Sequence, residues 1–145
     1  MPNINPSSPL IGALRWLLVP IAGLATALIV WATGAALIML FDWLWPMLAG
    51  YPFLDTWLFY ASPYVINFAV GALFCIAVCY TAPTKKLATG CVMAAALVLF
   101  GLLGDAPAIN DTLGEHVQAS LALLALSVGI IFALFTIYDK ERNPI

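Results

Sequence analysis

The chain has 145 residues, of which 64% are hydrophobic and only 8% are charged, and its mean hydropathy is +1.05. This composition excludes an ordinary soluble domain, in which roughly half of the residues are apolar and about a quarter are charged. The net charge of -2, with five scattered Lys and Arg residues, gives no basic surface for a nucleic acid. We therefore expect one transmembrane domain over residues 1–145, an all-α bundle of four transmembrane helices with short loops.

The first predicted span covers residues 16–41 and contains no charged residue. At about 26 residues it is longer than the apolar region of a cleavable signal, roughly 7 to 15 residues, so we expect a retained anchor. Residues 42–62 are rich in Trp, Tyr and Pro, which is typical of the headgroup level of a bilayer. This segment is predicted to be an interfacial aromatic loop.

The second span has two possible starts. Either Ser62 caps a helix whose first residue is Pro63, which gives a span over 63–82, or the helix begins near Trp57 and kinks at Pro63. The Ser-Pro start is the better prediction because it leaves about 20 residues, the length a bilayer requires. A polar turn then leads into a third span over 87–104, and these two spans should form an antiparallel hairpin.

The fourth span is predicted over 113–138, because Thr112 and Glu115 form a capping box at its start. Four spans place all the basic residues on one side, which the positive-inside rule identifies as the cytoplasm. Both termini are therefore expected on the cytoplasmic side, in a membrane that we take to be a bacterial cytoplasmic (inner) membrane. The basic residues are Arg15, Lys85, Lys86, Lys140 and Arg142.

No Asp, Glu, Lys, Arg or His lies inside the predicted spans, except Glu115 and His116 at the very start of the fourth. Proton relays and ion-coupled carriers normally need an ionisable residue within the membrane, so this absence disfavours a coupled transporter. No nucleophile has a base at a reachable spacing, and no phosphate-binding or zinc-protease motif occurs. We expect no catalytic residue and no cofactor.

One face of the second span is small and polar, with Asn67, Gly71 and Cys75 at successive intervals of four residues. This pattern predicts a helix-packing seam, and a pore lining is the alternative. Cys75 and Cys79 alone would make an incomplete site for a soft metal. All three cysteines, which include Cys91, are expected to be free thiols.

The fourth span has a similar face formed by Ala125, Gly129 and Ala133, a small-xxx-small run that predicts close helix contact. Gly23 with Ala27, and Gly90 with Ala94, are weaker instances of the same pattern. Such pairs often arise by chance in a chain rich in Ala and Gly, so the sequence supports no inference from them.

The predicted outer side gathers four possible ligands of a cation: Asp105, Asp111, Glu115 and His116. Carboxylates suit a hard ion, and the imidazole would suit zinc. The spacing matches no closed metal site, and a solvated loop that caps a helix explains the same residues, so no metal is predicted.

Two functions are compatible with these features. The leading hypothesis is a non-catalytic small membrane subunit that packs in a homo-oligomer or as an accessory subunit of a larger membrane complex. Its partners would then be the lipid bilayer and other membrane subunits or copies of itself. The alternative is a small channel or facilitator for an uncharged or lipidic solute, with the Asn67 face lining the path.

Overall fold

In a computed structural model, the chain is described over residues 9–48, 61–104 and 113–142. These residues form four helices: α1 (Pro9–Leu48), α3 (Ser62–Thr81), α4 (Lys86–Gly104) and α5 (Leu113–Arg142). No strand occurs among the described residues. All four helices are long and apolar enough to cross a membrane, as the sequence predicts.

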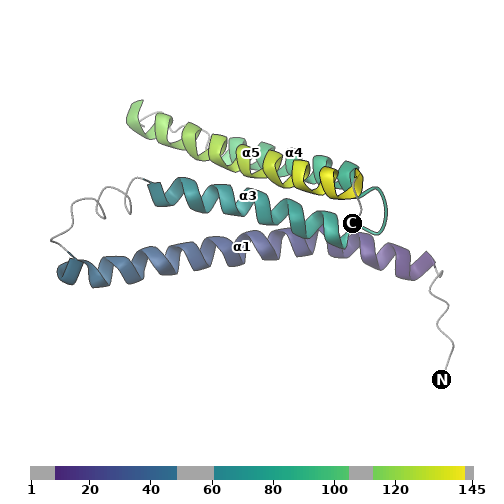
Figure 1. The fold of residues 1–145 in the computed structure, drawn as a ribbon, viewed down its shortest axis with the longest axis horizontal. Helices are drawn as coiled ribbons and strands as arrows, with labels where there is room; N and C mark the ends of the chain where they lie inside the picture. The colour runs from purple at the N-terminus through teal and green to yellow at the C-terminus, as the bar shows by residue number, and fades with distance from the viewer. Residues whose placement is uncertain (1–8, 49–60, 105–112, 143–145) are drawn as a thin grey trace, which may run out of the picture.

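The helix α3 is the centre of the arrangement. It lies between α1 on one side and α5 on the other, and the short turn after Thr81 returns the chain into α4 (Figure 1). The contacts of α3 with α5 and with α1 are the most extensive in the bundle, whereas α1 makes few contacts with α4 or α5. The hairpin predicted from the polar turn is therefore present, but α3 packs mainly against the other two helices.

The helix α1 differs from its prediction at its end. It continues through Leu48, so residues 42–48 are helical where the sequence analysis placed the start of a loop. Pro20 and Pro46 both lie inside α1. At 1.5 Å per residue, its 40 residues measure about 60 Å, and α1 projects beyond α3 at both ends (Figure 1).

The start of α3 agrees with the preferred prediction within one residue. The helix begins at Ser62, Pro63 lies in its first turn, and Ala61 occupies the cap position with helical backbone angles and no side-chain cap bond. Ser62 is therefore a helical residue and not the cap. The alternative start near Trp57 lies outside the described residues.

The other two helices also begin close to their predicted positions. The helix α4 starts at Lys86, one residue early, and α5 starts at Leu113 and ends at Arg142, four residues later than expected. The predicted cap of α5, Thr112, lies outside the described residues. The acidic residue of that capping box, Glu115, is in the first turn of α5.

The buried core is formed around α3. That helix contributes seven buried residues, whereas the described residues of α1 that are buried are Val19, Gly23 and Gly34. Contributions from α4 and α5 complete the core: Ala94, Leu126, Ile130 and Ala133. No polar or charged side chain is buried among the described residues. Many large apolar side chains are exposed along the helices, which suits contact with lipid.

Candidate functional site

The tightest glycine contacts among the described residues are between α3 and α5, at Gly71 and Gly129. A Cβ atom on Gly71 would collide with the carbonyl oxygen of Leu126, and one on Gly129 would collide with that of Phe68. The same Cβ on Gly129 would lie 3.1 Å from the backbone nitrogen of Ala72. Backbone faces backbone here, a contact that only glycine on each helix permits. We call this contact the glycine seam.

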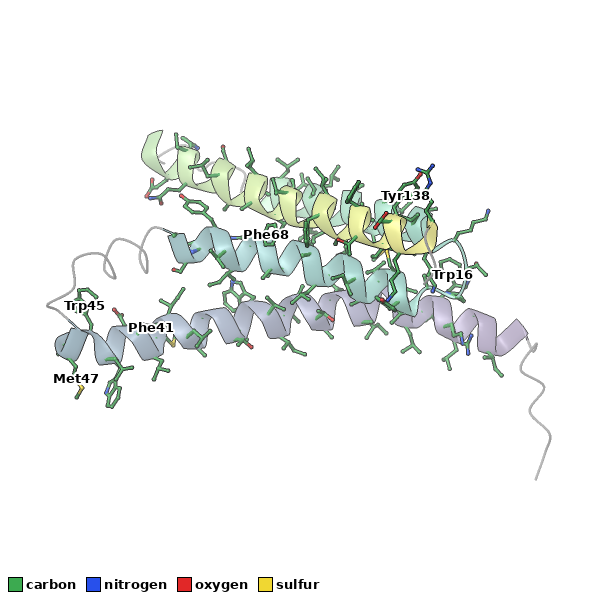
Figure 2. The ribbon with its side chains drawn as sticks, viewed as in Figure 1. Trp16, Phe41, Trp45, Met47, Phe68 and Tyr138 are labelled. Atoms are coloured by element: carbon green, nitrogen blue, oxygen red, sulfur yellow. The ribbon has the colours of Figure 1, made fainter. Side chains whose placement is uncertain are left out.

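The other residues of the two predicted faces differ in burial. Cys75 and Ala133 are fully buried, and Ala125 is partly buried. Beside the glycine seam, the ring centroids of Phe68 and Phe132 lie 6.0 Å apart. Figure 2 shows Phe68 between α3 and α5. At Gly71 and Gly129, α3 and α5 therefore pack against each other within one chain.

Polar side chains in the spans bond to their own helix. Asn67 donates its side-chain amide to the carbonyl of Pro63 at 2.9 Å, and Ser127 donates to Leu123 at 2.8 Å. Thr26, Thr33, Thr81 and Thr136 make the same kind of bond one turn back. These hydroxyls and this amide are therefore satisfied within a helix, and the glycine seam depends on close van der Waals packing.

Four glycines outside the predicted faces also mark helix contacts: Gly23, Gly34, Gly90 and Gly101. A Cβ on Gly23 would lie 2.7 Å from the ring of Phe74, and one on Gly34 would lie 2.7 Å from Ile66. Side chains of α3 therefore pack directly against both glycines of α1. A Cβ on Gly90 would lie 2.5 Å from the Sγ atom of Cys79. Gly23 and Gly90 belong to the weaker sequence patterns, which the spacing alone could not separate from chance.

The basic residues gather at one end of the bundle, where α1 begins and α3 and α5 end (Figure 1). There, Lys140 donates to the hydroxyl of Tyr80 at 3.3 Å, and its Nζ atom lies 5.9 Å from the centroid of that ring. The Nζ atom of Lys86 lies 6.0 Å from the same centroid. Both are cation–π distances. Together with Cys79, Ile137 and Glu141, these three residues line a cavity of about 230 Å³.

A second hollow lies at the same end, between α1 and α4. It has a volume of about 310 Å³ and is lined almost entirely by apolar groups. We call it the α1–α4 groove. Figure 2 shows Trp16 near the turn that joins α3 to α4. The lining residues are Trp16, Val19, Pro20, Lys85, Ala88, Thr89, Val92 and Met93.

The predicted outer cation site is only half described. Glu115 is exposed in the first turn of α5, and His116 follows it and is partly buried, whereas Asp105 and Asp111 lie outside the described residues. Within the described ranges, no three His, Cys, Asp or Glu side chains lie close enough to hold a metal ion. The described part of this cluster thus supplies no site on which a function can be built.

The three cysteines are free thiols in the structure, with Cys75 and Cys79 buried and Cys91 exposed. The Sγ atom of Cys79 donates to the carbonyl of Lys86 at 3.4 Å, so this thiol helps to hold the turn between α3 and α4. Its neighbour Cys75 is packed in the apolar core. Both thiols thus contribute to the packing of the bundle.

The comparisons with known proteins identify no relative of this chain. No protein-family model, no curated protein and no solved structure matches it. Its function must therefore be argued from its own geometry.

Proposed function

We propose that the chain is a non-catalytic membrane subunit that binds copies of itself or a larger membrane complex through the outer face of α1. In this proposal it lies in a bacterial inner membrane with both termini on the cytoplasmic side. The basic end of the bundle supports that orientation, because Lys and Arg concentrate on the cytoplasmic side of membrane proteins.

The observation that carries the proposal is a row of three exposed alanines on the outer side of α1, set among large apolar side chains such as Ile21 and Ile29. Residues two positions apart on a helix point about 200° apart, so the side of α1 opposite Gly23 and Gly34 carries Ala25, Ala32 and Ala36. All three alanines are exposed. Alanines let another helix approach closely, as the glycines on the inner side do for α3. A contact there would give α1 a partner on its exposed side.

The channel alternative has less support. Its path would follow the Asn67 face, yet Gly71 and Cys75 on that face are buried within the chain, and the Asn67 amide is bonded to its own helix. A pore would then have to form between copies and not along this seam.

The proposal is tested by purifying the tagged chain in a mild detergent and measuring the mass of the particle for two variants. Ala32→Leu thickens the outer face of α1, whereas Ala96→Leu makes the same change at an exposed position of α4. The wild type and Ala96→Leu should remain in a particle larger than one chain, and Ala32→Leu should lose its partner. A monomeric wild type, or equal particles for all three proteins, would contradict the proposal.

A further inference from the structure

We propose that the α1–α4 groove binds one anionic phospholipid, with an acyl chain lying in the groove and the phosphate group at Lys85. This inference goes beyond the subunit role and uses only the insertion of the helices in a bilayer. It stands on the shape of the groove, the position of its one charged residue and the surroundings of the neighbouring lysine.

The groove exists because α1 and α4 both pack on α3 and make few contacts with each other. Its walls are apolar, and Trp16 and Val92 are exposed by 45% and 67%, so they remain open to the membrane. An engineered apolar cavity of about 150 Å³ holds benzene, so about 310 Å³ has room for a segment of a hydrocarbon chain. One turn of a helix, about 10 Å in diameter and about 5.4 Å high, takes up about 420 Å³, which is more than this volume. The size therefore selects an acyl chain over a helix from a partner or a second copy.

Lys85 is the one charged residue among those that line the groove, and it directly precedes the first residue of α4, where the bundle meets the headgroup level. Its backbone has a positive φ of 49°. The Lys85 carbonyl accepts the backbone N–H of Thr89 at 3.0 Å and the Thr89 hydroxyl at 3.2 Å. These two bonds to α4 fix the backbone from which the ammonium group extends.

The two adjacent lysines have different surroundings. The Nζ atom of Lys86 lies over the Tyr80 ring together with that of Lys140, on the side of the bundle formed by α3 and α5. Glu141 lines the cavity beside Tyr80, Lys86 and Lys140 but does not line the α1–α4 groove. Lys85 thus places positive charge at the groove without an acidic residue in its lining, which complements a phosphodiester. Lys86 provides a charge-matched control.

The experiment uses the full chain with Trp16 as its only tryptophan, the other four being replaced by Phe, in phosphatidylcholine vesicles. Brominated phosphatidylglycerol and brominated phosphatidylcholine are added in turn, and quenching of Trp16 fluorescence reports which lipid occupies the groove. Phosphatidylglycerol should be preferred by about fivefold, the factor that one lysine contributes at an anionic surface. Equal quenching by the two lipids would overturn the proposal.

Three variants locate the binding. Lys85→Asn should abolish the preference and keep the fold, because Asn tolerates a positive φ. Lys86→Asn removes the same charge and should keep most of the preference. Ala88→Phe, at an exposed position of the groove wall, should reduce quenching by both lipids. The proposal fails if the two lysine variants lose the preference equally, or if Ala88→Phe leaves quenching by phosphatidylglycerol unchanged.

Discussion

The helices α1 and α3 are comparably apolar, yet α3 supplies most of the core and α1 lies at its edge. In water, such apolar helices would both be driven to bury their surfaces. In a bilayer, lipid tails solvate leucine as well as another helix does, so apolarity does not decide which helix becomes central. Close approach decides which helix is central. The backbones of α3 and α5 meet at the glycine seam, whereas α1 contacts α3 through side chains that pack against Gly23 and Gly34.

The largest effect is expected where the comparison is sharpest, at the glycine seam. Gly129→Ala places a Cβ against the Phe68 carbonyl, which cannot move without displacing α3, so the free energy of unfolding should fall by about 3 kcal/mol. Gly12→Ala on α1 is the matched control, because a Cβ there has nothing within 4 Å. It should leave stability unchanged or raise it by up to about 1 kcal/mol through helix propensity. Unfolding by SDS in mixed micelles, followed by circular dichroism, measures both. Equal stabilities of the Gly129→Ala and Gly12→Ala variants would show that the glycine seam does not hold α3 and α5 together.

A smaller effect is expected from emptying the contact between α1 and α3. Phe74 is 2% exposed and its ring lies against Gly23, so Phe74→Ala leaves a cavity and should cost about 2 kcal/mol. The cost is lower than in a soluble core because the unfolded side chain also lies in lipid. Leu24→Ala changes a neighbouring residue of α1 that is 55% exposed and should cost less than about 0.5 kcal/mol. The same SDS titration compares them, and an equal loss for both would show that α1 has another buried face.

The smallest effect is expected from the hydroxyl groups. Thr26 and Ser127 lie on different helices, but each donates to its own helix at 2.8 Å. Thr26→Val and Ser127→Ala should therefore change the unfolding free energy by less than about 0.5 kcal/mol, since neither removes a bond between helices. A loss of more than about 1 kcal/mol in the SDS titration would mean that the hydroxyl bonds across a helix interface in the membrane.

The four helices could be predicted from the sequence because runs of apolar residues and polar turns mark them directly. The end of α1 could not. Trp43, Trp45 and Pro46 are typical of the headgroup level whether the backbone there is helical or not. Pro46 lies in the last turn, where it removes one helical hydrogen bond but does not end the helix.

The candidate site was predictable only in part. The spacing of Gly71 and Gly129 marks a small face on each helix, but it does not say which helices are neighbours. Gly34 stood in no small-residue pattern, and its importance depends on Ile66, which the sequence gives no reason to place opposite it. The convergence of Lys86 and Lys140 on Tyr80 likewise joins residues far apart in the chain. These contacts are decided by tertiary packing, which periodicity within one helix does not contain.

The length of α1 has a consequence for the surrounding membrane. Its uncharged stretch between Arg15 and Asp42 measures about 39 Å as a helix, whereas the 20 residues of α3 measure about 30 Å, close to the thickness of the hydrocarbon layer. In a bilayer that both helices span, either α1 is inclined to the membrane normal or the lipid around it is locally thicker. The longer apolar stretch lies on the α1 flank of the bundle. The protein would therefore meet membranes of different thickness with an asymmetric fit, and thicker bilayers would suit the α1 flank best.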